Sequence, residues 1–178
     1  MNKILKEILS TSIYLLFVLM LTYLFITYVG QRTQVSGSSM ETTLHDGDNL
    51  MVDKFSYRFK DPERFDIIVF PPPLQHEDAY YIKRIIGLPG ETIQIDEEGV
   101  IYIDGEVLDE NYGREVIKNP GLAQNAITLG DDEYFVMGDN RNNSTDSRAF
   151  GSIHKRDIIG KAWIRLWPFE RFGVLKHQ

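Results

Sequence analysis

The 178-residue chain contains no cysteine. Disulfides, a thiol nucleophile and thiolate metal ligands are therefore all excluded. Positive charge is also scarce: without Lys3, Lys6 and Glu7 the chain has 17 Lys and Arg against 25 Asp and Glu, so residues 31–178 carry a formal charge of −8. A nucleic-acid partner, which needs a basic face, is not expected. An apolar core must hold these residues together, and a segment of this size can bury one.

Charge is missing altogether from residues 8–30, which are mostly apolar. About 20 apolar residues are enough for a helix to span a membrane. A cleaved secretory signal would have a shorter apolar run, of roughly 7–15 residues, and an A-x-A-like cleavage site, which residues 30–34 lack. Lys3 and Lys6 precede the run, and such charges favour the cytoplasmic side. We therefore predict a cytoplasmic N-terminus at 1–7, a transmembrane anchor at 8–30 and an extracytoplasmic domain at 31–178.

The rest of the chain has neither internal repeats nor low-complexity segments, and its pattern is mostly that of short strands. Residues 31–38 are mostly polar and contain Gly and Ser, so we expect a loop that leaves the membrane. Strands are predicted at 49–54, 66–70, 79–86, 92–95, 100–103, 133–137 and 161–167. Many short strands between turns are typical of a mainly β fold, either a partly open barrel or a sandwich. The anchor is the only long helix predicted.

A serine cluster follows the predicted anchor, at Ser36, Ser38 and Ser39. Taken alone, such a cluster is most often a flexible loop. Ser39 is also a candidate nucleophile close to a membrane surface. A serine hydroxyl is a poor nucleophile, however, unless a base removes its proton.

Histidine is the usual base, and the chain has four, at positions 45, 76, 154 and 177. His45 is near Ser39 in sequence but lies in a polar turn, and none of the four is in an apolar segment that would hold it in place. A Ser-His-Asp triad is recognised by geometry, so the sequence leaves it open.

Lys83 is a second candidate base, because it lies inside an apolar run. If residues 79–86 form a strand, Lys83 shares one face with Tyr81 and Ile85. Burial there would lower the pKa of the amine, and a neutral lysine can accept a proton from serine. The same pattern also fits, and more often indicates, a lysine that reaches from an edge strand into water.

Residues 138–151 form a third segment, dense in Asp, Asn and Ser, and are typical of a structured loop. We reject a calcium loop of the EF-hand type, since Ser144 and Phe150 stand where that loop needs Gly and Glu. One interpretation is a turn held by an ion pair between Asp146 and Arg148. The other is a wall of an active site in which Ser144 orients Lys83.

Taken together, these segments resemble the bacterial type I signal peptidases, and the single anchor resembles the forms from Gram-positive bacteria. The similarity rests on five segments in the same order along the chain. They are Ser38-Ser39-Met40 with Thr43-Leu44; Gly47-Asp48 with Val52-Asp53-Lys54; residues 66–70; residues 83–90; and residues 138–141 with Ser144, Asp146-Ser147-Arg148 and Phe150-Gly151.

The resemblance implies a role for each residue that matches the family pattern. Ser39, directly before the methionine, would be the nucleophile, with Ser38 as its competitor. Lys83 would be the general base, Ser144 would be hydrogen-bonded to it, and Asp146 and Arg148 would be structural.

The resemblance also implies a substrate and a setting. The expected partners are preproteins that carry signal peptides, and membrane lipid against an apolar face of a β-rich catalytic domain. Trp163, Trp167 and Phe169 would belong to that face unless they pack in the core. Neither a metal nor another cofactor is expected.

Two positions depart from the family pattern. Thr42 stands where the family usually has proline, which costs some loop rigidity. Gly37 stands where some members have a serine whose hydroxyl helps to form the oxyanion hole. The hole would then rest on the backbone N–H of Ser39 and one further donor. Other enzymes of this kind also carry glycine there, so inactivity does not follow.

Two other classes of protein remain to be weighed. One is a catalytically inactive, membrane-anchored module that binds exported chains; the presence of Ser39, Lys83, Ser144 and Asp146 argues against it. The other is a self-cleaving repressor with related chemistry. Those proteins are soluble and carry a DNA-binding domain where this chain has its predicted anchor.

Overall fold

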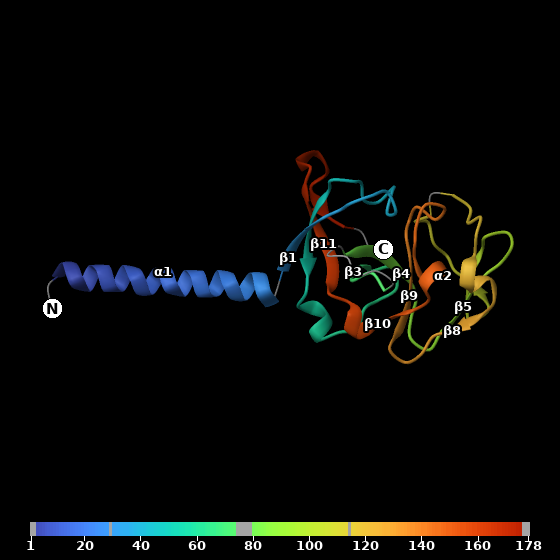
Figure 1. Cartoon of the computed structure of the whole chain (residues 1–178), viewed down its shortest axis with the longest axis horizontal. Helices are drawn as coiled ribbons and strands as arrows, with labels where there is room; N and C mark the ends of the chain where they lie inside the picture. The colour runs from blue at the N-terminus through green and yellow to red at the C-terminus, as the bar shows by residue number, and fades with distance from the viewer. Residues whose placement is uncertain (1–2, 29, 74–79, 114, 176–178) are drawn as a thin grey trace.

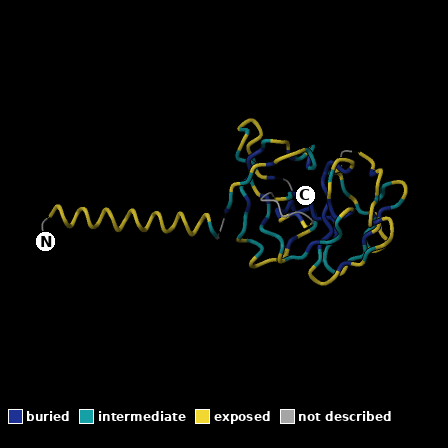
Figure 2. The backbone as a smooth tube through the Cα atoms, viewed as in Figure 1, coloured by how far each residue is buried: buried dark blue, intermediate teal, exposed yellow. Residues whose placement is uncertain are grey.

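The computed structural model describes residues 3–28, 30–73, 80–113 and 115–175 (Figure 1). Helix α1 (Lys3–Tyr28) extends away from the β-rich body, and almost all of its described residues are exposed (Figure 2). It is long and apolar enough to cross a membrane, which fits membrane anchoring. The helix begins before the uncharged run, because Lys and Glu are good helix formers, and it ends before Gly30, which already pairs with Asp53 in a sheet. The position of the membrane boundaries along it stays a prediction.

In the described part of the chain, two antiparallel sheets make up the body, which confirms a mainly β fold. The larger sheet is curled into a half-barrel and runs in the order β1-β2-β11-β3-β4-β9-β10, with β12 paired to β11. Its strands are β1 (Gly30–Gln34), β2 (Asn49–Asp53), β3 (Ile67–Phe70), β4 (Tyr81–Gly87), β9 (Glu133–Met137), β10 (Ile153–His154), β11 (Gly160–Trp167) and β12 (Gly173–Val174).

The smaller sheet lies at the end of the body far from α1 (Figure 1) and has the order β7-β6-β5-β8. Its strands are β5 (Thr92–Ile95), β6 (Ile101–Ile103), β7 (Glu106–Val107) and β8 (Ile127–Thr128). The remaining helical elements are short: η1 (Ser56–Arg58), η2 (Gly121–Gln124), α2 (Ser147–Phe150), η3 (Lys155–Asp157) and η4 (Phe169–Arg171).

All seven predicted strands are present, with small shifts at their ends; Ala79, the first residue of one prediction, lies outside the described residues. The prediction of a loop over residues 31–38 is wrong for its first half, because residues 31–34 belong to β1. This strand is polar because it is an edge strand with one paired side, along β2. Strands β7, β8, β10 and β12 were not predicted, since two residues are too few for an alternating pattern to show.

Strand β4 is central, because it lies between β3 and β9. The interpretation of Lys83 as a lysine on an edge strand is therefore wrong: its residue is only 3% exposed. A strand buried on both faces explains why the sequence around Lys83 is a continuous apolar run rather than an alternating one.

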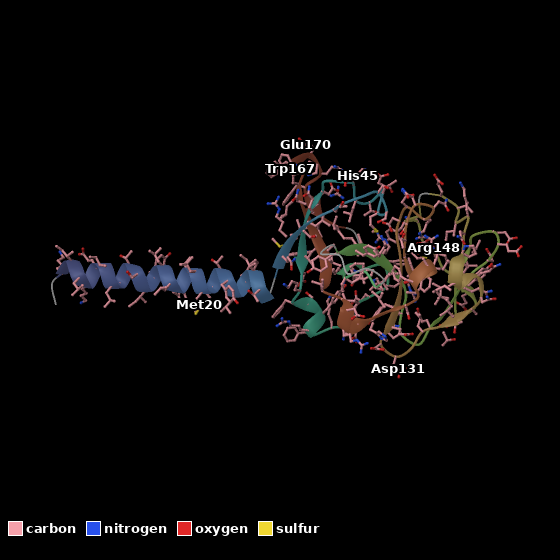
Figure 3. The ribbon with its side chains drawn as sticks, viewed as in Figure 1. Met20, His45, Asp131, Arg148, Trp167 and Glu170 are labelled. Carbon is pink, nitrogen blue, oxygen red and sulfur yellow. The ribbon has the colours of Figure 1, made fainter. Side chains whose placement is uncertain are left out.

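The core packs along the larger sheet and between the two sheets, and its described residues form three clusters of buried apolar side chains. Met40 and Leu44 belong to the first cluster and are almost completely buried. Trp163, Trp167 and Phe169 are outside it, with exposed fractions of 48%, 50% and 72%. Figure 3 shows Trp167 at one tip of the body, at the end of β11. The alternative that these three side chains pack in the core is therefore wrong.

Candidate active site

The loop that carries Ser39 connects β1 to β2 and is held at both ends. At its base, the Val35 N–H donates to the Asp48 carbonyl at 2.8 Å, and the Gly47 N–H donates to the Val35 carbonyl at 2.9 Å. Farther along, the buried side chains of Met40 and Leu44 fix the loop against the core. The serine cluster is thus part of a loop fixed by packing, which the local sequence alone did not reveal.

Lys83 reaches Ser39 from the central strand β4. Its Nζ atom lies 2.7 Å from the Ser39 Oγ atom, although 44 positions separate the two residues. The ring of Tyr81 lies on the same side of the strand, with its centroid 5.2 Å from Nζ. The alternation inferred from sequence, with Tyr81 and Lys83 on one face, agrees with this contact.

The pKa of Lys83 is lowered from 10.5 to about 8. Burial is the main cause, because removing the ammonium from water disfavours the charged form. Asp146 and Asp139 oppose the shift by stabilising positive charge, and Arg148 adds to it. A lysine with this pKa is neutral in part of the population near neutral pH, so it can accept a proton from a hydroxyl group.

Asp146 and Arg148 form a buried ion pair with side-chain oxygen and nitrogen 2.8 Å apart. The Asp146 carboxylate also accepts a hydrogen bond from the Gly138 N–H at 3.1 Å, so the pair fixes both ends of the loop after β9. Figure 3 shows Arg148 on α2, within the body. A Cβ at Gly138 would overlap both the Ser39 carbonyl and Ser144, which shows how closely this loop approaches the Ser39 loop.

Ser144 lies in the same cleft as Ser39 and Lys83. Its hydroxyl is buried and makes no hydrogen bond to any described residue, so the expected bond to Lys83 is not formed in this structure. The lysine is instead directed at Ser39. Rotation about one side-chain bond decides which of these contacts a serine makes, and a sequence pattern does not carry that information.

Ser38, the competitor for the role of nucleophile, has a different partner. Its Oγ atom accepts a hydrogen bond from Asn143 Nδ2 at 2.8 Å.

Neither His45 nor His154 lines the cleft, so a catalytic triad through either of these histidines has no support. His76 and His177 lie outside the described residues.

The cleft has a volume of about 400 Å³ and is open to solvent along one side. Three segments form its walls: residues 35–40, residues 80–83 and residues 142–145. It runs past the Ser39 hydroxyl and the Lys83 amine, so a chain lying in it would pass both groups. Chemically, this arrangement suits a hydrolase that attacks through a serine with a neutral lysine as base.

Comparison with known proteins supports the same class. The family model for signal peptidases, peptidase S26, matches residues 6–167. A probable signal peptidase I-2 of Synechocystis sp. is 42% identical over 84% of this chain and 68% of its own length. Signal peptidase I of Bacillus amyloliquefaciens is 38% identical over 89% of this chain and 85% of its own.

A solved structure of a signal peptidase I from Enterococcus faecalis is 35% identical in sequence to this chain. The match covers 57% of this chain and 97% of the Enterococcus chain, with a TM-score of 0.45. The family model spans nearly the whole length, and the relatives match over most of theirs. The chain therefore belongs to the signal peptidase family, peptidase S26, and is a peptidase.

Proposed function

We propose that this peptidase removes signal peptides from exported preproteins, with Ser39 as the nucleophile and Lys83 as the general base. The observation that carries the proposal is the 2.7 Å contact between Lys83 Nζ and Ser39 Oγ, made by an amine whose burial lowers its pKa to about 8. Ser38 is the weaker candidate, because its hydroxyl is bonded to Asn143 instead of to a base.

The reaction proceeds in two halves. Neutral Lys83 takes the Ser39 proton as Ser39 Oγ bonds to the scissile carbonyl carbon and the carbonyl electron pair moves to oxygen. When the tetrahedral species collapses, the C–N bond breaks, and Lys83 returns the proton to the leaving amine. A water molecule then attacks the acyl-enzyme with Lys83 again as base, which frees the acid and restores Ser39.

The supporting residues act on the position and charge of Lys83. Asp146 and Arg148 hold the loop that closes one side of the cleft, and they act in opposite directions on the Lys83 pKa, which Asp146 raises and Arg148 lowers. Ser144, which lines the same cleft, supports the lysine by orienting it during turnover.

The substrate lies extended in the cleft, between the Ser39 loop and the segment that leads into β4. Signal peptides carry small residues at the first and third positions before the cut, in an A-x-A pattern. Shallow apolar pockets suffice for such side chains, and the apolar residues Val35, Met40 and Ile82 are among those that line the cleft.

The membrane completes the arrangement. Helix α1 crosses it once, with the N-terminus in the cytoplasm and the catalytic domain outside, in keeping with Lys3 and Lys6 at the N-terminal end. The exposed side chains of Trp163, Trp167 and Phe169 contact lipid, since aromatic rings favour the membrane–water interface. This position brings the cleft close to substrates that are themselves in the membrane.

An inactive module that binds exported chains is the alternative. Such a module does not need a buried lysine in contact with a serine. Burying an amine costs free energy, and amines with a strongly lowered pKa are typical of catalytic sites. The intact pair therefore disfavours it.

The test is cleavage of a preprotein with an Ala-x-Ala site by the purified full-length protein in detergent, with Ser39→Ala and Lys83→Ala assayed in parallel. We expect cleavage after the second alanine by the parent protein and none by either variant. Parental rates in either variant would overturn the assignment of the pair. Binding of the preprotein by the parent without cleavage would favour the inactive module.

A further inference from the structure

The backbone N–H of Ser39 is free to bind a substrate. It donates no hydrogen bond to any residue in the described part of the chain, whereas the Ser39 carbonyl accepts one from the Asn140 N–H at 3.0 Å. Ser39 lines the cleft, so its N–H is one donor for the negative oxygen that forms when the Ser39 hydroxyl attacks a carbonyl. Such sites generally use two converging donors, which raises the question of the second.

Gly37 does not supply the second hydrogen-bond donor. Its N–H already donates to Asp46 Oδ1 at 2.8 Å, and it has no side chain. Its φ of +86° is in the left-handed region, which a residue with a side chain rarely adopts. A hydroxyl at this position would therefore strain the loop.

Two other polar groups of the cleft are also unsuitable. Both hydrogens of the Asn142 amide are used, in bonds to Glu115 Oε2 at 3.1 Å and to the Val116 carbonyl at 2.9 Å. The Ser144 hydroxyl is buried below the cleft surface, so a substrate oxygen does not reach it.

The hydroxyl group of Ser38 can serve as the second donor. Its Oγ accepts from Asn143 Nδ2 at 2.8 Å, and its own hydroxyl proton has no acceptor among the described residues. Its carbonyl is held by two further donors, Asn140 Nδ2 at 3.0 Å and the Glu41 N–H at 3.1 Å. The residue is therefore held by both its backbone and its side chain, with one hydrogen left to donate.

We propose that the Ser38 hydroxyl is the second donor of the oxyanion hole and that Asn143 is the residue that positions it. This inference rests on the proposed function, since it requires attack by Ser39. The bond lengths of the chain keep Ser38 Oγ within about 5 Å of the Ser39 nitrogen, so both donors can reach one oxygen. By occupying a lone pair of Ser38 Oγ, Asn143 directs the hydroxyl hydrogen away from itself.

The experiment compares kcat and KM of purified Ser38→Ala, Ser38→Thr and Asn143→Asp on an Ala-x-Ala preprotein in detergent. Rates are taken on the alkaline plateau of each pH profile, so that a change in the Lys83 pKa does not enter. Ser152→Ala, a serine outside the cleft, is the matched control, and thermal unfolding checks that each variant is folded.

We expect Ser38→Ala to lower kcat by about 10²–10³-fold with little change in KM, the loss typical of one oxyanion donor. Ser38→Thr, which keeps the hydroxyl, should stay within about tenfold of the parent. Asn143→Asp keeps Ser38 but offers it an acceptor in place of a donor, so its kcat should fall as in Ser38→Ala. If Ser38 had a purely structural role, the kcat of Asn143→Asp would stay near that of the parent.

A parental kcat in Ser38→Ala, with Ser39→Ala inactive, would overturn the inference and leave the proposed function intact. Activity in Ser39→Ala would instead overturn the proposed function itself. If Ser38→Ala does not fold, Asn143→Asp decides: a parental kcat in that variant also overturns the inference.

Discussion

The guanidinium group of Arg84 donates hydrogen bonds to both carboxylate oxygens of Asp139, at 2.9 and 2.8 Å, and neither side chain is exposed. Because Arg84 follows Lys83 in β4, the two side chains leave the strand on opposite faces. The Thr43 hydroxyl donates to the same carboxylate at 2.5 Å. Asp139 thus connects the strand that carries Lys83 to the loop that carries Ser39.

We expect Asp139→Asn to lower the free energy of unfolding by about 3–5 kcal/mol, because it leaves the Arg84 charge buried without its counter-ion. Chemical denaturation in detergent measures the loss. A double variant, Arg84→Met with Asp139→Leu, removes both charges and should recover most of the stability. If the single variant is as stable as the parent, the ion pair does not hold these two segments together.

The rate of cleavage should follow the titration of Lys83. Since its pKa is about 8, the amine is neutral in about a tenth of the molecules at pH 7 and in about nine tenths at pH 9. We expect kcat to rise through this range and level off above it, as measured on an Ala-x-Ala preprotein. Lys83→Arg, which stays charged, should be inactive throughout. A profile that is flat from pH 6 to 9, or centred near 10.5, would contradict Lys83 as the base.

The same lowered pKa predicts a cost in stability. Between pH 8 and 10.5 the unfolded chain holds a proton on Lys83 that the folded protein has lost, so stability rises with pH across that window. Below pH 8 the full penalty applies, of the order of 3 kcal/mol. Lys83→Met removes the amine and with it this penalty. The variant should therefore be more stable than the parent at pH 7, and the difference should vanish above pH 10.5.

Chemical denaturation at several pH values measures this difference. Lys118→Met is the matched control, since Lys118 is exposed and should show no comparable gain. A parent that is as stable as Lys83→Met at pH 7 would mean that burial of the amine carries no penalty.

Patterns that depend on local chemistry were readable in the sequence. The uncharged run predicted the apolar helix, and alternating or apolar runs predicted every strand of four residues or more except β1. The sequence did not predict strand β1, because its stability comes from pairing with β2, about 20 residues away, and not from apolar side chains of its own.

The sequence also singled out Ser39 and Lys83, which the structure brings together; their catalytic roles stay predictions. What it did not show is how distant segments meet. The bond between Ser38 and Asn143 joins residues 105 positions apart, and Arg84 and Asp139 are 55 apart. Single polar residues at such separations carry no periodic signal, so their pairing emerges only from the folded sheet.

Ser144 offers the last test, because its hydroxyl is buried without a hydrogen-bond partner among the described residues and the residue lines the same cleft as Lys83. An unpaired buried hydroxyl costs about 1–3 kcal/mol, so Ser144→Ala should unfold at the same or a higher temperature than the parent. If the hydroxyl turns to Lys83 during turnover, as we propose, the same variant should lose about tenfold or more in kcat at unchanged KM. Thermal unfolding and preprotein kinetics on one preparation separate the two effects. Ser144→Thr, which keeps the hydroxyl, should retain more activity than Ser144→Ala. A parental kcat in Ser144→Ala would mean that Ser144 only fills space beside the lysine.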